Sequence, residues 1–373
     1  MLKPNLRISF FKRKIHSFYF FGIFGFVIGM LLGIVLCWFL HVLIFPILVM
    51  GFTGAATFFV LAFLVKRVTG KDTIVYYHHE IAILVICAIL LKVLGLPVLA
   101  YLDIIILGIA TFLAFGRIGC FSVGCCHGRP VKKGIIYGQE HVKAGFTYYY
   151  EGVPLLPVQL IESAFVFFII ITGIFLLLQH FPPGTVLIQY TVLYGAFRFA
   201  LEFLRGDAER PYFKGLSEAQ WTTLLLIGIS IIMAFSGFVP LYTWHILISI
   251  LLFITGSVIV IRDSLSNKIS SPRHIWQIAM ALSEFNNEKN EADFSQKQLT
   301  VYKTQLGLNL SIGQLINEGK PINHYTISCK KGNQITYHLI KKLAGVIKQL
   351  QKHTGLYEIS ENNNQIFHII FKD

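Results

Sequence analysis

Polar side chains recur at helical spacing within one strongly apolar run, residues 189–205. Successive members of this stripe are four, four and three positions apart: Tyr194, Arg198, Glu202 and Arg205. At about 100° per residue they fall within an arc of roughly 80° on one helix. Charge on such a helix is costly to bury, so we expect the stripe to face protein, water or an anionic ligand.

Two interpretations of this stripe stay open. It can form half of an active site, or it can be an internal Arg198–Glu202–Arg205 ion-pair network that only locks helices together. Because buried charge is expensive without a use, the residue types favour the active site.

A glycine-rich run from Gly116 to Pro130 supplies a second arginine, Arg117, at the end of an apolar stretch. Its four glycines in thirteen residues, Gly119 and Gly128 among them, predict a polar loop whose N–H groups approach a ligand. The alternative is an arginine that only anchors a helix end at the headgroups.

Two further clusters could contribute chemistry. Gln159 and Glu162 lie one turn apart at the start of another apolar run, where Glu162 could also act only as a helix cap. Adjacent His78 and His79, next to Glu80, make a plausible proton acceptor, although a histidine near a span is usually structural.

The elements that position these residues are membrane spans. Of the 373 residues, 55% are hydrophobic and only 14% are charged, and several stretches reach the ~20 apolar residues that cross a bilayer. We predict an all-α polytopic membrane protein with about 7–8 transmembrane helices, the first one retained. Expected spans are residues 17–40, 43–65, 74–91, 98–115, 158–180, 185–204, 220–238 and 242–261.

Three regions follow from composition. Residues 1–16 form a basic N-terminal segment, residues 17–262 the transmembrane domain, and residues 263–373 a small soluble α+β domain whose role the sequence does not assign. The formal net charge of +13 is interpreted as membrane-flanking Lys and Arg. Nucleic acid is not an expected partner, because no recognised motif accompanies the charge.

These pieces, in this order, resemble the bacterial prolipoprotein diacylglyceryl transferase family over roughly residues 15–240. The matching motifs are Gly116-Arg-Ile-Gly, Pro157-x-Gln-Leu-x-Glu162, Tyr194-Gly-Ala-Phe-Arg-x-x-x-Glu-Phe-x-Arg205 and Leu216-Ser-x-x-Gln220. The stretch from Tyr194 to Arg205 is the most specific.

The resemblance implies transfer of the diacylglyceryl group of phosphatidylglycerol to the lipobox cysteine of a prolipoprotein, with release of glycerol phosphate. It implies no cofactor and no metal, and a multi-pass protein of the bacterial cytoplasmic (inner) membrane. Its partners would be phosphatidylglycerol, the prolipoprotein signal peptide and membrane lipids.

The resemblance also assigns residues. The family's catalytic groups fall on Arg117, Arg198 and one of His78 and His79, with His78 preferred. Substrate binding is expected at Tyr194, Glu202, Arg205, Gly119, Gly128, Gln159, Glu162 and Gln220. The residue chemistry fits independently, because two guanidiniums can hold a phosphate as its charge grows, and a histidine or a cationic field would help form the thiolate.

Departures from the family pattern keep alternatives open. Where the family has Asn, Asn and Glu, this chain has Cys120, Val123 and Cys125, and His79 and Glu80 replace paired glycines. A divergent transferase with another donor or acceptor is one alternative. A non-catalytic lipid or anion transporter is another, although its signature of two related halves with broken helices is not seen.

Two structural questions also stay open. Cys120, Cys125 and Cys126 could bind a metal or form a disulfide, but plain packing is favoured over both. The basic segments fall on one side of an eight-span bundle, which the positive-inside rule makes cytoplasmic, whereas the family's catalytic loops open outward. We follow the family, since anionic lipid explains basic residues on the active side.

Overall fold

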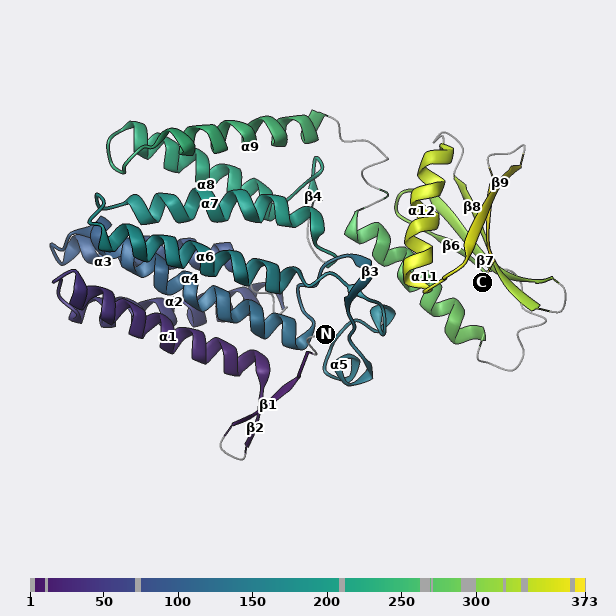
Figure 1. Ribbon diagram of the computed structural model, residues 1–373, viewed down its shortest axis with the longest axis horizontal. Coiled ribbons are helices and arrows are strands. Elements are labelled where there is room, and N and C mark those ends of the chain that lie inside the picture. Colours follow the sequence, from purple (N-terminus) through teal and green to yellow (C-terminus); the bar gives the residue numbers. More distant parts are fainter. Residues whose placement is uncertain are drawn as a thin grey trace.

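The computed structural model describes residues 4–10, 13–70, 75–207, 212–261, 269, 271–289, 300–317, 320–329, 335–362 and 366–372. Figure 1 shows an elongated molecule, with a bundle of long helices at one end and a separate C-terminal domain at the other. Loops and short strands lie between them. The predicted domain boundary at residues 262–263 lies outside the described residues.

Within the described residues, eight long helices form the bundle: α1 (Ser17–Phe39), α2 (Phe45–Thr69), α3 (Tyr76–Val93), α4 (Val98–Val123), α6 (Val158–Leu178), α7 (Thr185–Leu201), α8 (Glu218–Phe235) and α9 (Thr243–Ile261). Seven of them are long and apolar enough to cross a membrane. The remaining one, α7, has 17 residues and lies among the others. The predicted polytopic helical fold is confirmed.

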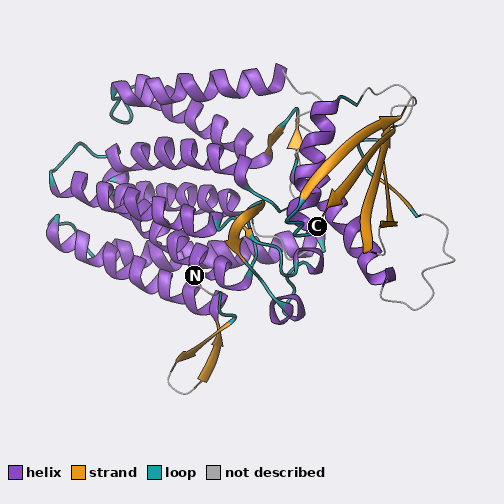
Figure 2. Cartoon of the chain, turned by 45° about the vertical axis from the view of Figure 1, so that its right-hand side comes forward, coloured by secondary structure: helices purple, strands orange, loops and turns teal. Residues whose placement is uncertain are grey.

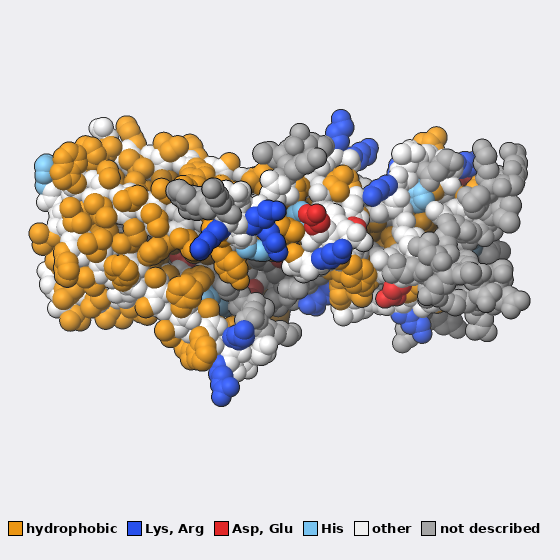
Figure 3. Space-filling model, turned by 90° about the horizontal axis from the view of Figure 1, so that it is seen from below, with side chains coloured by type: hydrophobic (Ala, Val, Ile, Leu, Met, Phe, Trp, Pro, Cys, Tyr) orange, Lys and Arg blue, Asp and Glu red, His pale blue; other side chains and the backbone are white. Residues whose placement is uncertain are grey.

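The outside of the bundle is apolar. Phe59, Phe168 and Leu225 are among many large hydrophobic side chains that remain exposed, and Figure 3 shows such side chains covering one face of the bundle. Lys and Arg side chains gather instead where the bundle meets the loops and the C-terminal domain. This distribution suits a lipid-facing wall with its basic groups at one membrane surface.

Helix α4 holds the centre of the bundle and is packed tightly against α1. A Cβ added at Gly29 would lie 2.7 Å from the carbonyl oxygen of Gly108, so the two backbones approach as only small residues allow. Farther along, Gly119 faces the backbone of Phe18, whose Cα would lie 3.3 Å from an added Cβ.

Asp103 fixes α7 relative to α4 at the end of the bundle away from the loops. Its buried carboxylate accepts hydrogen bonds from the backbone N–H groups of Gly184 (2.7 Å) and Leu187 (2.8 Å), at the start of α7. A carboxylate suits a helix N-terminus because it meets unpaired N–H groups and the positive end of the helix dipole. The two helices that carry Arg117 and Arg198 are therefore tied together at their far ends.

Residues 124–157 form a linking segment, which contains β3 (Pro130–Ile135), α5 (Gln139–Lys143) and η1 (Tyr148–Tyr150). Backbone hydrogen bonds join it to neighbouring helix ends. The Gly128 N–H donates to Leu156 O (3.1 Å), Arg129 N–H to Leu204 O (3.0 Å), and Gly206 N–H to His127 O (3.0 Å). The loop after α4 is thus attached to the start of α6 and the end of α7.

Two short antiparallel hairpins complete this end of the bundle. They are β1 (Arg7–Phe10) with β2 (Arg13–His16), and β4 (Tyr212–Phe213) with β5 (Leu216–Ser217). The second leads directly into α8.

The C-terminal domain contains α11 (Pro272–Lys289), β6 (Val301–Lys303), β7 (Leu308–Asn317), β8 (Lys320–Cys329), α12 (Tyr337–Leu350), β9 (Leu356–Asn362) and β10 (Ile366–Lys372). Its antiparallel sheet has the order β6-β7-β8-β10-β9, and Figure 2 shows the strands fanned beside the two helices. Phe367, Ile369 and Phe371 alternate into the core. The α+β prediction is confirmed.

The C-terminal domain shares a hydrophobic core with the linking segment. Tyr137, Tyr150 and Leu155 of that segment belong to the same buried cluster as the domain's own core. The Tyr149 ring also packs on Trp276 at 6.4 Å. The domain therefore sits at the end of the bundle where the arginine-bearing helices finish.

Two local predictions were wrong. The expected span 98–115 continues as helix to Val123, so Gly116 and Gly119 are helical rather than parts of a ligand-binding loop. Gly119 instead accommodates the backbone of α1. Helix α7 ends at Leu201 and is followed by η2 (Glu202–Leu204), so the four stripe residues do not share one α-helix.

Candidate active site

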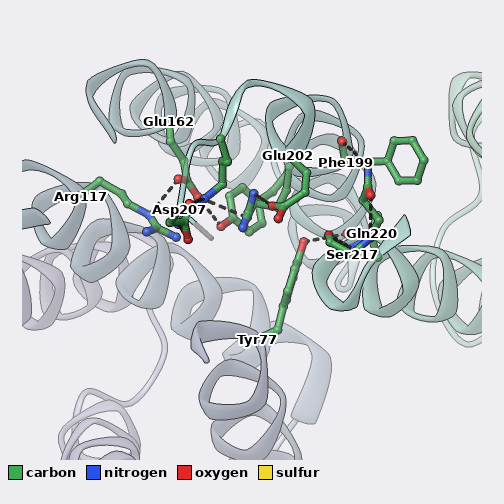
Figure 4. Close-up of polar contacts among 12 residues, drawn as sticks. Tyr77, Arg117, Glu162, Phe199, Glu202, Asp207, Ser217 and Gln220 are labelled. Atoms are coloured by element: carbon green, nitrogen blue, oxygen red, sulfur yellow. Dashed lines mark hydrogen bonds and ion pairs between the residues drawn. The ribbon is translucent and has the colours of Figure 1, made fainter. Parts of the chain in front are cut away.

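The centre of the site is Glu162, which is fully buried in the second turn of α6. Its Oε2 lies 2.9 Å from Arg117 Nε and its Oε1 lies 3.8 Å from Arg198 Nε. The hydroxyl of Tyr194, one turn before Arg198, donates to Oε1 at 2.9 Å. These side chains come from three different helices, α4, α6 and α7, and Figure 4 shows Arg117 and Glu162 pointing toward each other.

The network extends along the end of α7. Arg198 Nη1 lies 2.5 Å from Glu202 Oε2, and both side chains are buried. Arg205 forms a bidentate pair with Asp207, with both N–O distances 2.7 Å. Arg205 therefore pairs with Asp207, in a contact that the predicted Arg198–Glu202–Arg205 network does not include.

Within the described residues, the guanidiniums of Arg117, Arg198 and Arg205 are paired with the carboxylates of Glu162, Glu202 and Asp207. Balance matters because an uncompensated charge at this depth costs several kcal/mol, of order 3–5 when one partner of a buried pair is removed. The pairs use Nε of Arg117, and Nε and Nη1 of Arg198. Each guanidinium has five N–H donors, so both arginines have donors beyond these ion pairs for an anionic ligand.

Aromatic side chains line the adjoining wall. The Tyr194 ring lies 5.2 Å from Tyr190 and 6.0 Å from Tyr77 of α3. The Tyr77 and Thr223 hydroxyls share a hydrogen bond of 3.0 Å, which links α3 to α8. The sequence analysis did not single out Tyr77, although it directly precedes His78 and His79.

The two candidate histidines lie in different surroundings. His78 is half exposed, and its Nε2 lies 3.0 Å from a carboxylate oxygen of Glu218 at the start of α8. His79 is buried against Phe58, with Nδ1 3.0 Å from Val75 O and Nε2 without a hydrogen-bond partner among the described residues. Both directly follow Tyr77 in the sequence, and the Tyr77 ring packs near Tyr194.

Two predicted site residues make contacts that position the backbone. The amide of Gln159 donates to Cys125 O at 2.8 Å. Gln220 forms a capping box with Ser217 at the start of α8, and its side chain also donates to Phe199 O at 3.1 Å. These contacts hold the ends of α4, α7 and α8 around the arginines.

Only glycine at position 128 lets the loop after α4 approach the backbone of Leu156 closely. A Cβ there would lie 2.5 Å from Leu156 O, the carbonyl that its own N–H contacts.

A thiol cluster lies directly beside the arginines. The sulfurs of Cys120, Cys125 and Cys126 all lie within 4.8 Å of one another, a grouping that could hold a metal ion. Hydrogen bonds from Cys120 and Cys125, and then the charges of Arg205 and Arg117, lower the pKa of the Cys126 thiol well below its usual range. All three cysteines are free thiols in the structure.

Comparison with known proteins identifies a family for most of the transmembrane domain. The family model described as prolipoprotein diacylglyceryl transferase matches residues 6–236. This range contains both central arginines, Glu162 and the thiol cluster, and excludes the C-terminal domain.

Curated relatives match a shorter part of the chain. Among them are phosphatidylglycerol–prolipoprotein diacylglyceryl transferases of Clostridium tetani (35% identical over 134 residues, 36% of this chain and 52% of the relative) and Clostridium perfringens (35% over 137 residues, 35% and 50%). The Dehalococcoides mccartyi protein is 31% identical over 132 residues, 35% of this chain and 48% of the relative. The chain therefore spans about half the length of these relatives.

No solved structure matches the chain. The family assignment therefore depends on the sequence match. The contacts around Glu162 explain why residues from separate motifs occur together. Three motifs that lie far apart in the sequence bring Arg117, Glu162 and Arg198 to one buried point. With 231 of its 373 residues covered by the family model, the chain belongs to the prolipoprotein diacylglyceryl transferase family.

Proposed function

We propose that this protein transfers the diacylglyceryl group of phosphatidylglycerol to the lipobox cysteine thiol of prolipoproteins and releases glycerol phosphate. One observation carries the proposal. Arg117 and Arg198, from separate helices, converge on the single carboxylate of Glu162 at the loop end of the membrane bundle. A lipid phosphate that enters between the helices at headgroup depth meets two fixed guanidiniums.

The chemistry asks for such an arrangement. The acceptor thiolate attacks a glyceryl carbon, and the carbon–oxygen bond to phosphate breaks with its electron pair on oxygen. Arginine donors that hold the phosphate stabilise the charge that grows there. Glu162 and Glu202 keep both guanidiniums in place before the lipid binds, so that little reorganisation is needed in the transition state.

The remaining residues receive supporting roles. Tyr194 orients Glu162, and Arg205, held in place by Asp207, adds N–H donors where the loop meets α7. Four residues affect substrate binding indirectly, because they position the backbone around the arginines: Gly119, Gly128, Gln159 and Gln220. His78 or His79 accepts the thiol proton, and His78 is the more accessible of the two.

The setting proposed is the bacterial cytoplasmic membrane, with the site open to its outer surface and with prolipoprotein signal peptides and membrane lipids as partners. Basic residues at the loop end then contact anionic headgroups. The lipid chains lie against the apolar helices.

A genetic experiment tests the proposal. The protein is expressed in a bacterium depleted of its own transferase, beside Arg117→Ala and, as a matched control, Arg67→Ala, an exposed arginine at the end of α2. We expect growth and lipoprotein maturation with the parent and the control, and neither with Arg117→Ala. A parent protein that inserts in the membrane but leaves prolipoproteins unmodified would contradict the proposal.

A second candidate differs only in its substrates. Cys120 and Cys125 stand where the family has Asn and Glu, and their thiols adjoin the arginines, so another phospholipid could be the donor. Mass spectrometry of peptide products formed in a mixture of phospholipids identifies the donor. With acyl chains of a different mass on each phospholipid, a product that carries another lipid's chains, or that forms undiminished when phosphatidylglycerol is omitted, would favour this second candidate.

A further inference from the structure

The backbone folds three thiols together at the end of α4. Cys120 lies in the last turn, and the next two cysteines follow Gly124, which ends the helix with φ 85°. Cys126 itself adopts φ 56°, in the left-handed region that a residue with a Cβ enters at a cost of roughly 1–2 kcal/mol. These two turns bring the sulfurs of Cys125 and Cys126 back to within 4.8 Å of Cys120.

Three converging sulfurs match the preference of a thiophilic divalent cation. Zinc binds thiolates at about 2.3 Å in tetrahedral geometry, which places sulfurs roughly 3.8 Å apart. The observed spacing requires only a small side-chain adjustment. Four protein ligands close a structural zinc site, whereas three leave a position open for a substrate.

We propose that Cys120, Cys125 and Cys126 bind a thiophilic divalent cation such as zinc, whose open fourth position takes the acceptor cysteine thiol as a thiolate. This inference rests on the proposed function, because it names the device that activates its acceptor.

The charges around the cluster suit a bound cation. Three thiolates with one divalent cation carry a net charge of −1, and −2 once the acceptor thiolate joins. Buried Arg117 lies one turn before Cys120 on α4, and buried Arg205 forms a β-bridge with Gly128, two residues after Cys126. They compensate the anionic complex where burial would otherwise make it expensive.

The placement also serves the reaction. Arg117 lies one turn before Cys120 on the same face of α4, and it pairs with Glu162 at the centre of the site. A thiolate held by the cluster therefore lies near the proposed phosphate position. Coordination makes the thiol more acidic, so its proton passes to the histidine base of the proposed function, and the bound sulfur forms the C–S bond as the C–O bond breaks toward phosphate. The neutral thioether product is a weak ligand and leaves the cation.

Metal binding is measured directly on the full-length protein purified in detergent under reducing conditions. We expect about one zinc per chain by mass spectrometry of the metal, and three sulfur neighbours by X-ray absorption. A lipobox peptide raises the sulfur count to four, whereas the same peptide with serine in place of cysteine leaves it at three. The triple variant Cys120→Ser, Cys125→Ser, Cys126→Ser loses the zinc, and the control Cys329→Ser in the C-terminal domain keeps it.

Several results would overturn the inference. They are a parent protein that binds zinc no better than the triple variant, a sulfur count unchanged by the peptide, and a disulfide between any two of the three cysteines in protein alkylated at lysis. Failure of the inference is distinguishable from failure of the proposed function. Undiminished thioether formation by metal-free protein would remove the cation and leave the transferase standing.

Discussion

Ion pairs of the same length occur in opposite surroundings in the bundle and in the C-terminal domain. Arg198–Glu202 and Lys372–Glu358 both have N–O distances of 2.5 Å, but the side chains are 3% and 1% exposed in the first pair and 57% and 65% exposed in the second. Water and salt screen the exposed pair, so it contributes little. In the buried pair, each charge depends on its partner.

The two regions place their apolar and charged side chains in opposite ways. The C-terminal domain buries Phe367, Ile369 and Phe371 and leaves its ion pair in water, as soluble domains do. The bundle exposes its apolar residues to lipid and buries charge at one end. Buried charge is costly in the bundle, which is why the proposed function is located at Glu162.

The largest expected effect comes from the buried pair. Arg198→Ala leaves Glu202 unpaired and Glu162 with one guanidinium fewer, so we expect transfer to fall by roughly a thousandfold and stability by about 3–5 kcal/mol. The double variant Arg198→Gln, Glu202→Gln removes the charges together and recovers much of the melting temperature without recovering transfer. A double variant that transfers at the parental rate would show that the Arg198–Glu202 pair only holds the helices together.

The next effect tests whether the linking segment positions the site. In Gly128→Ala, the new Cβ would lie 2.5 Å from Leu156 O, so the loop must shift away from α6. We expect transfer to fall roughly tenfold to a hundredfold, because small misplacements of catalytic groups are costly. The matched control is Gly138→Ala, where an added Cβ meets nothing within 4 Å. Equal transfer rates for the two variants would argue against a positioning role.

A smaller effect is expected from one hydroxyl group. Tyr194→Phe removes a hydrogen bond to buried Glu162, and Tyr101→Phe removes one to Leu43 O at the opposite end of the bundle. Each should cost about 1–3 kcal/mol in thermal unfolding. Only Tyr194→Phe should also slow transfer, by about tenfold. Equal transfer by both variants would separate Tyr194 from the chemistry.

The smallest effect completes the comparison. Lys372→Ala breaks the exposed pair with Glu358, and we expect no measurable change in melting temperature or transfer. A loss comparable with that of Arg198→Ala would show that burial does not decide the value of these pairs.

Much of the architecture could be predicted from sequence because the membrane imposes simple requirements. Apolar runs of sufficient length marked the spans, and costly charges marked Arg117, Glu162 and Arg198 as residues that need partners. The change in composition after the last span likewise predicted an α+β domain in residues 263–373. Each of these signals is local.

Features set by tertiary contacts could not be predicted in this way. The helical continuation through Gly119 depends on the backbone of α1, and the partner of Arg205 depends on where the chain turns after α7. Convergence of the three thiols requires a left-handed Cys126, which residue type does not indicate. Contact between the C-terminal domain and the linking segment joins regions far apart in the chain.

The central claim, that the buried arginines serve diacylglyceryl transfer, is tested most directly by the product itself. Purified protein is incubated with phosphatidylglycerol and a lipobox peptide, and the peptide is analysed by mass spectrometry beside the Arg198→Gln, Glu202→Gln variant. The account predicts a diacylglyceryl thioether on the cysteine with the parent and none with the folded variant. A folded parent protein that forms no thioether, or a variant that forms as much as the parent, would contradict it.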